Sequence, residues 1–162
     1  MNNFVSLYAK SNQGTMKKLL IMALTLSMTA CSMIQSDDDK ATEIAVQWGE
    51  AYFNCDFHAA EKLSTPESLR WLQFAASNTT QEDLDLLKQQ AADVEATDYI
   101  PEANDTLRVV ELRVDHYLSK NLSVGVSQQM EEAVFHITTV KRNGSWQVRM
   151  AGLPRSEKQS RD

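Results

Sequence analysis

The 162-residue sequence predicts an α+β domain in which N-terminal helices pack on an antiparallel β-sheet of about four strands. Apolar residues recur every three to four positions over residues 41–90, as on one face of an α-helix. Over residues 94–150 they recur at every second position, as on one face of a β-strand. Helices that precede the strands, rather than alternating with them, are typical of the α+β class.

Start signals support the helical half of the prediction. Asp56 can accept a backbone N–H bond and so cap a short helix. Pro66 suits the first position of the next helix, and Thr80 with Asp83 three residues later indicates a capping box. The helices are expected over residues 41–54, 57–63, 66–76 and 80–90.

Alternation places specific side chains on the inner face of the sheet. Strands are expected over residues 94–100, 107–118, 129–142 and 146–150. In the first strand Asp98 falls on the same face as Val94, and in the second His116 falls on the inner face while Asp115 and Tyr117 face outward.

The Asn143-Gly144 pair predicts a two-residue hairpin turn between the last two strands. This turn fixes the register, and the apolar faces of the two strands then coincide. The expected facing pairs are Ile137 with Met150, Thr139 with Val148, and Lys141 with Trp146.

The N-terminal stretch resembles a bacterial lipoprotein signal. Lys17 and Lys18 precede an uncharged run, and Thr29-Ala30-Cys31 closes it. The run of about ten apolar residues is too short to span a bilayer. The resemblance implies cleavage before Cys31 and lipid on its thiol. Met28 stands where such signals usually have Leu, so an ordinary secreted protein cut nearby is the alternative.

The signal sets the expected domain organisation. Lipid on Cys31 would tether the protein to a membrane of the bacterial cell envelope, and Ser32 is compatible with sorting to the outer membrane. Asp37-Asp38-Asp39 fits either a solvated spacer or the acidic start of a helix. The expected segments are an over-extended start (1–15), a signal peptide (16–30), a flexible tether (31–40), one α+β domain (41–153) and a disordered tail (154–162).

Charge and cysteine content exclude some functions. Removal of Lys10, Lys17 and Lys18 leaves 13 of the 16 basic residues against 22 acidic ones, a formal charge of −9. Such an acidic chain without a Lys/Arg cluster argues against nucleic acid as a partner. With Cys31 lipidated, Cys55 has no disulfide partner and is expected to be a small buried residue at a helix end rather than a reactive thiol.

The stretch AYFNCDFHAAEKLST, residues 51–65, resembles the opening of the nuclear-transport-factor-two-like (cystatin-like) superfamily. Residues 71–78 and 146–157 are also similar to small envelope lipoproteins of unknown function from Bacteroidetes. The superfamily resemblance implies a cone in which a curved sheet wraps a long helix and leaves a concave pocket. Residues 78–90 add a helix to the commonest pattern of the superfamily.

Inward-facing side chains on this layout define a candidate pocket. Its expected members are Trp48, Tyr52, Leu112, His116, Phe135 and Trp146. Aromatic residues, Trp71 among them, could form a ligand cage there, although aromatics at these spacings commonly form the core. His58 and His136 show no local ligand spacing, so no metal site is expected. No phosphate loop or dinucleotide fingerprint is present, and no cofactor is expected.

These observations favour a non-catalytic envelope lipoprotein that binds a small apolar ligand, or a partner protein, on its concave side. The first alternative is a cofactor-free lyase or isomerase that uses His116 with Tyr52. The second alternative is a structural homodimer joined through the outer sheet faces, to which Val109 and Val134 would contribute.

Overall fold

The structure, a computed structural model, describes residues 36–101, 105–121 and 125–157. Its helical elements are α2 (Asp37–Phe53), α3 (Phe57–Lys62), the 3₁₀ turn η1 (Pro66–Ser68), α4 (Leu69–Ser77) and α5 (Gln81–Gln89). Its strands are β1 (Asp93–Pro101), β2 (Leu107–Asp115), β3 (Leu118–Asn121), β4 (Val126–Gln129), β5 (Glu132–Arg142) and β6 (Ser145–Val148). The predicted over-extended start, the signal peptide and Cys31 lie outside the described residues.

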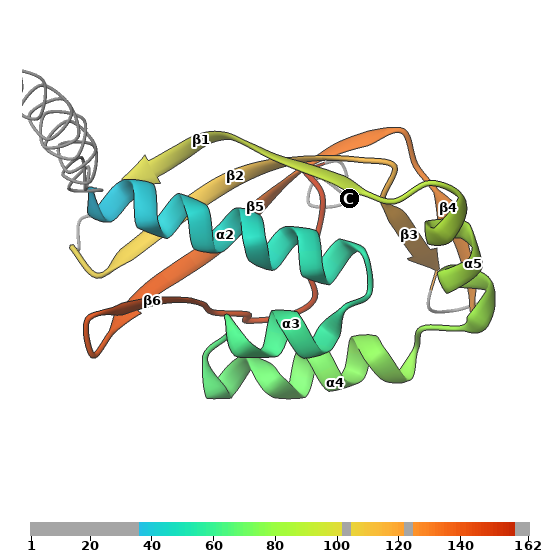
Figure 1. Cartoon of the computed structure of the whole chain (residues 1–162), viewed down its shortest axis with the longest axis horizontal. Coiled ribbons are helices and arrows are strands. Elements are labelled where there is room, and N and C mark those ends of the chain that lie inside the picture. Colours follow the sequence, from blue (N-terminus) through green and yellow to red (C-terminus); the bar gives the residue numbers. More distant parts are fainter. Residues whose placement is uncertain (1–35, 102–104, 122–124, 158–162) are drawn as a thin grey trace, which may run out of the picture. The chain divides into compact units, whose positions relative to one another are not determined.

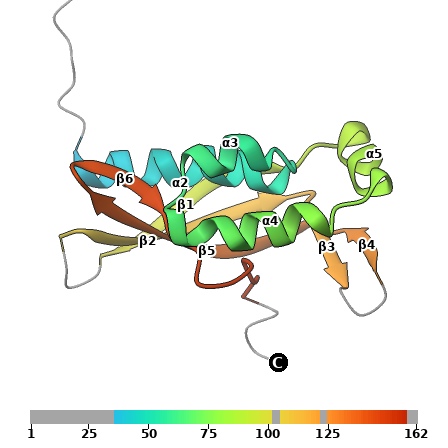
Figure 2. The same ribbon diagram turned by 90° about the horizontal axis from the view of Figure 1, so that it is seen from below.

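The predicted α+β class is confirmed. The helices precede an antiparallel sheet of four strands in the order β1-β2-β5-β6, and β3 and β4 form a separate two-stranded sheet. Helix α2 lies along one face of the four-stranded sheet, whose core is built from alternate residues of β2 and β5 (Figure 1). Helix α3 contacts both α2 and α4 (Figure 2). No helix of the described part is long and apolar enough to cross a membrane.

Helix α2 begins four residues earlier than predicted. Ser36 and Asp39 form a capping box, and the acidic first turn suits the positive end of the helix dipole. Asp38 and Asp37 also bind the sheet, through Arg108 at 2.6 Å and Lys141 at 2.5 Å. Residues 36–40 of the predicted flexible tether therefore belong to the start of α2, whose acidic first turn is formed by the three aspartates. Residues 31–35 lie outside the described residues.

The buried side of α2 sets how closely the helix approaches the sheet. Trp48 is fully buried, and its indole N–H donates a 2.9 Å hydrogen bond to the Ser64 hydroxyl. A Cβ on Gly49 would lie 2.8 Å from Cδ1 of Leu112 and 3.0 Å from Cγ1 of Val94. Glycine is thus the residue that lets α2 contact β1 and β2.

The other helix starts follow the predicted caps. The carboxylate of Asp56 accepts a hydrogen bond from the Ala59 N–H at the start of α3. Thr80 and Asp83 form the expected capping box of α5. The helix predicted over residues 66–76 is split into the 3₁₀ turn η1 and α4.

A β-bulge in β1 corrects the predicted position of Asp98. Pairing with β2 shifts between Ala96, opposite Leu112, and Asp98, opposite Glu111. The extra residue, Thr97, turns the rest of the strand over, because a shift of one residue exchanges the two faces. Asp98 is therefore exposed on the outer face with Glu111 rather than inside the cone.

A second irregularity ends β2 at Asp115, before the predicted end of the strand. His116 adopts a left-handed backbone conformation with φ of 56°, and the alternation of faces is lost there. Tyr117, predicted to face outward, is 5% exposed and packs edge-on against Phe135. The chain then forms β3 and β4, which were not predicted, and the strand predicted over 129–142 is β5, which begins at Glu132.

The hairpin between β5 and β6 agrees with the predicted turn. Asn143 and Gly144 both have positive φ, at 52° and 83°, and the register pairs Thr139 with Val148 and Lys141 with Trp146. The predicted pairing of Ile137 with Met150 does not form. The strand ends at Val148, and the Met150 N–H donates to the hydroxyl of Ser68 at 2.9 Å instead.

The chain after β6 is ordered beyond the predicted end of the domain. Ser156 is 1% exposed and forms an antiparallel bridge with Phe135. The N–H of Glu157 donates to the Val134 carbonyl at 3.1 Å. Residues 154–157 of the predicted disordered tail are therefore part of the domain, and residues 158–162 lie outside the described residues.

Candidate functional site

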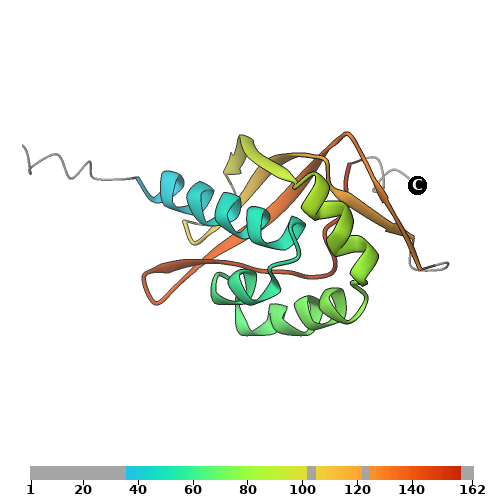
Figure 3. The same cartoon turned by 45° about the vertical axis from the view of Figure 1, so that its right-hand side comes forward.

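A cavity of about 760 Å³ opens at the end of α2. Its wall includes the residues that follow α2, the helix α4, the first turn of α5, the β3–β4 pair, and residues 151–155 after β6. Figures 1 and 3 show α5 and the β3–β4 pair at the same end of the domain. The volume falls within the range typical of small-molecule sites.

Aromatic side chains from α2, α3, α4 and β5, and one from the connection between β2 and β3, form most of the apolar wall. They are Tyr52, Phe53, Phe57, Trp71, Phe74, Tyr117 and Phe135. Phe53 and Tyr117 both pack on Phe135, with ring centroids 4.7 and 5.1 Å away. Phe74 is 44% exposed and belongs to the open side of the cavity. A ligand in this cavity would meet ring faces and edges over most of its surface.

One side of the cavity is polar. Lys120 Nζ donates to Asp83 Oδ2 at 2.7 Å, and the two side chains are only 20% and 6% exposed. Burial opposes ionisation of Asp83, but hydrogen bonds from Lys120 and from the backbone N–H of Thr80 outweigh it and lower the pKa of Asp83 to about 2. Asn78 and Thr79 lie on the same wall. The cavity therefore holds an ion pair in which each charge is already compensated.

Two groups on the wall have unusual environments. The indole N–H of Trp71 is buried and has no hydrogen-bond partner among the described residues. Cys55 has a left-handed backbone with φ of 62°, and burial raises the pKa of its thiol. The thiol is thus mainly protonated near neutral pH. A protonated thiol is a poor nucleophile, which agrees with the structural role predicted for Cys55 at a helix end.

The structure brings together two of the six predicted pocket residues. Tyr52 and Phe135 line the cavity. Trp48 and Leu112 are fully buried in the core, with the ring of Trp48 stacked on Tyr52 at 4.7 Å. Trp146 is buried between β6 and the start of α2, where Arg108 and Lys141 lie over its ring.

His116, the sixth predicted pocket residue, does not line the cavity. Strict alternation would place His116 on the inner face, but its left-handed backbone interrupts the alternation. Tyr117 is buried there instead. Burial raises the pKa of Tyr52, so its phenol stays protonated and does not serve as a base near neutral pH. The structure therefore does not bring the predicted His116–Tyr52 pair together on the wall of this cavity.

Sequence reasoning missed the polar wall. The sequence predicts Asp83 only as a helix-capping residue, and the Thr80–Asp83 spacing accounts for that role completely. Lys120 lies in β3, a strand of only four residues, which is too short for an alternation of apolar and polar residues to predict it. Residues 151–155 line the cavity because the chain pairs again with β5 at Ser156. This segment contains Gly152 and Pro154 and has no apolar alternation that would predict the pairing.

No protein-family model matches the chain, and no curated protein matches it. Among solved structures, one similar chain is a Xanthomonas campestris protein assigned as a calcium/calmodulin-dependent protein kinase II association domain. The two chains share 10% identity, the match covers 75% of this chain and 86% of that one, and the TM-score is 0.44.

A second similar structure is Rv3472, a Mycobacterium tuberculosis protein of unknown function in a singly substituted form. It shares 9% identity, with coverage of 90% of this chain and 78% of that one, and a TM-score of 0.43. At these identities and TM-scores neither likeness bears on the ligand or activity of this chain.

Proposed function

We propose that this chain is a non-catalytic lipoprotein of the bacterial envelope whose α+β domain binds a small apolar molecule in the cavity at the end of α2. The observation that carries the proposal is the cavity of about 760 Å³ with its aromatic wall. A concave, mainly apolar site with a few polar groups is the usual form of a small-molecule site. Lipid on Cys31 would hold the domain at a membrane.

The chemistry of the wall favours a particular kind of ligand. The body of the ligand would pack against Phe57, Trp71, Phe74 and Tyr117, and burial of its apolar surface would supply most of the affinity. A hydrogen-bond acceptor on the ligand would satisfy the buried indole N–H of Trp71. Because Asp83 and Lys120 already neutralise each other, the site favours an apolar molecule with one neutral acceptor over a strongly charged one.

The groups on the wall do not form an acid–base pair. Cys55 and Tyr52 both have raised pKa values, and the carboxylate of Asp83 is held ionised by Lys120. None of these groups is poised to exchange a proton near neutral pH. This arrangement supports binding over the lyase or isomerase alternative.

The test uses an apolar fluorescent probe and two variants on adjacent positions of α4. Ala75 lines the cavity, whereas Ala76 is exposed and does not. Ala75→Trp should fill the cavity, and Ala76→Trp adds the same side chain outside it. The full chain is titrated with N-phenyl-1-naphthylamine, a neutral apolar probe whose fluorescence rises in apolar surroundings.

We expect saturable binding of one probe per chain to the unsubstituted protein and to Ala76→Trp, and at least about tenfold weaker binding to Ala75→Trp. Equal binding by all three proteins, or saturable binding by none, would contradict the proposal. Circular dichroism of each variant checks that the fold is retained.

A further inference from the structure

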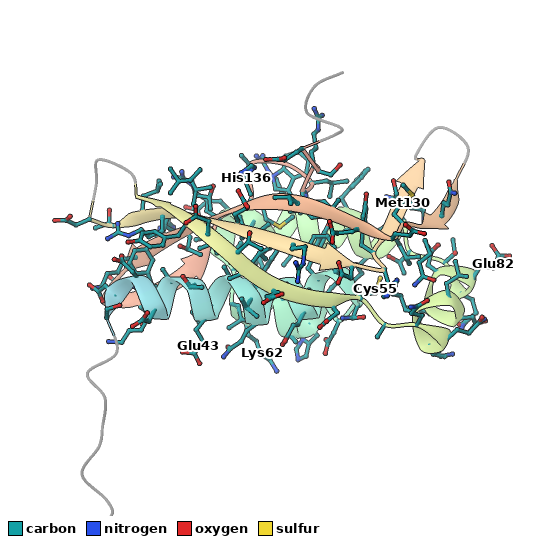
Figure 4. The ribbon with its side chains drawn as sticks, turned by 90° about the horizontal axis from the view of Figure 1, so that it is seen from above. Glu43, Cys55, Lys62, Glu82, Met130 and His136 are labelled. Carbon is teal, nitrogen blue, oxygen red and sulfur yellow. The ribbon has the colours of Figure 1, made fainter. Side chains whose placement is uncertain are left out.

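The outer face of the sheet, opposite the core, carries three side chains whose ligand-type atoms converge. They are Glu111 on β2, His136 on β5 and Glu157 in the segment after β6, and one atom from each lies within 4.8 Å of the others. Figure 4 labels His136 on the side of β5 away from α2. This cluster is separate from the cavity, none of whose wall residues belongs to it.

The distances within the cluster suit a shared cation better than direct bonds. His136 Nε2 lies 3.6 Å from Glu111 Oε2 and 3.8 Å from Glu157 Oε1. Both separations are longer than hydrogen bonds between an imidazole and a carboxylate. In a tetrahedral zinc site with metal–ligand bonds of about 2.0–2.1 Å, neighbouring ligand atoms are roughly 3.3 Å apart. A shift of a few tenths of an ångström would bring each carboxylate oxygen to that separation from His136 Nε2. The two carboxylate oxygens, which lie within 4.8 Å of each other, would approach one another by side-chain rotation.

The backbone fixes the three residues next to one another. Glu111 and His136 are directly opposite in the β2–β5 ladder. The Glu157 N–H bond to the Val134 carbonyl, with the bridge between Ser156 and Phe135, holds the third residue beside β5. The site would therefore need only side-chain adjustment to bind a metal.

An outer contact also orients the first carboxylate. The Thr97 hydroxyl donates to Glu111 Oε1 at 2.8 Å, which leaves Oε2 directed at His136. Thr97 is the extra residue of the β1 bulge, so the irregularity in the strand supplies this contact. Hydrogen bonds that orient a ligating carboxylate in this way commonly accompany metal sites.

Arg113, two residues from Glu111 on the same face of β2, is engaged elsewhere. Arg113 contacts Glu95 and lies 4.0 Å from Glu132, and no contact between it and the cluster is found among the described residues. Asp98, opposite Glu111 on β1, adds further negative charge to the same row. The local field thus favours a divalent cation.

We propose that Glu111, His136 and Glu157 form a binding site for Zn²⁺. Two carboxylates and one neutral imidazole would balance the charge of the ion, and water would complete a four-coordinate shell. Because the ligands come from β2, β5 and the segment after β6, the bound ion would cross-link that segment to the sheet. The same segment leads back to residues 151–155 of the cavity wall.

The test compares zinc binding by the full chain, without a histidine tag, with binding by three variants. His136→Gln and Glu157→Gln each remove one proposed ligand. Glu132→Gln removes a carboxylate from the same face of β5, four residues from His136, and is the matched control. Isothermal titration with Zn²⁺ gives stoichiometry and affinity, and thermal melts with and without Zn²⁺ report stabilisation.

We expect one Zn²⁺ per chain, a rise in Tm on zinc addition, and at least about tenfold weaker binding in both ligand variants but not in Glu132→Gln. Absence of saturable binding to the unsubstituted chain would overturn the proposal. Equal affinity in all four proteins would overturn it too. If His136→Gln lost zinc binding while Glu157→Gln kept its full affinity, the proposal would also be overturned, because Glu157 would then not be a ligand.

Discussion

Lys120 Nζ and Asp83 Oδ2 are 2.7 Å apart, and this contact joins β3 to the first turn of α5 on the wall of the cavity. The Asp83 carboxylate also accepts the N–H of Thr80 at 2.8 Å as part of the capping box. One side chain therefore starts a helix and anchors the two-stranded sheet against it. The polar wall of the cavity depends on this pair.

Replacing Lys120 with Met should lower the free energy of unfolding by about 2–3 kcal/mol, because the carboxylate of Asp83 would be left buried without its partner. Urea denaturation of the full chain measures the change. The double variant Asp83→Asn/Lys120→Met should be more stable than Lys120→Met alone. Equal stability of the single and double variants would contradict a buried charge as the cause.

The same pair predicts a specific loss of stability in acid. Although burial alone would raise it, the pKa of Asp83 falls from 3.8 to about 2 in the fold because of its hydrogen bonds. Its contribution is therefore present above about pH 4 and is lost as the pH falls towards about 2, with a magnitude of about 2 kcal/mol. Denaturation curves across this range should show a steeper loss in the unsubstituted chain than in Asp83→Asn/Lys120→Met. Parallel losses would place the acid sensitivity elsewhere.

Gly49→Ala should destabilise the domain by about 1–2 kcal/mol, since the new methyl group would press on Leu112 and Val94 in the packed interface of α2. The higher helix propensity of Ala offsets only part of this cost. Gly152→Ala is the control, because a Cβ there meets no atom within 4 Å. Chemical denaturation should separate the two variants, and equal stability would show that α2 can move away from the sheet.

Cys55 should react with iodoacetamide more slowly than a free cysteine near neutral pH, because burial raises the pKa of its thiol and only the thiolate is the nucleophile. The rate should rise as the pH is increased through the raised pKa. Mass spectrometry of the Cys31→Ser chain follows the reaction at Cys55 alone. A rate like that of a free cysteine at all pH values would show that the cavity wall opens readily.

The parts of the fold that could be predicted from the sequence depend on local signals. Caps at Asp56 and Thr80 and the Asn143-Gly144 turn are each specified by a few neighbouring residues, and all three form as expected. The inner face of β2 also follows simple alternation up to Val114, and that of β5 does so up to Thr139. These features need no knowledge of distant contacts.

The errors arise where one residue changes the register of a strand. Thr97 and His116 each interrupt the alternation, so Asp98 and His116 leave the inner face and Tyr117 enters it. Neither residue is a Gly, which is the usual sign of such a position. The site was therefore predicted only in part: Tyr52 and Phe135 were found, and the polar wall, formed by residues distant in sequence, was not.

Native mass spectrometry most directly tests whether the cavity binds a molecule. The Cys31→Ser chain, which lacks the proposed lipid anchor, and the same chain with Ala75→Trp would be purified gently from the periplasm of the original host. We predict an additional stoichiometric mass on the first protein, released by mild denaturation, and its absence from Ala75→Trp, whose cavity is filled. The bare mass of the chain in both preparations, or the same additional mass on both, would contradict ligand binding in this cavity.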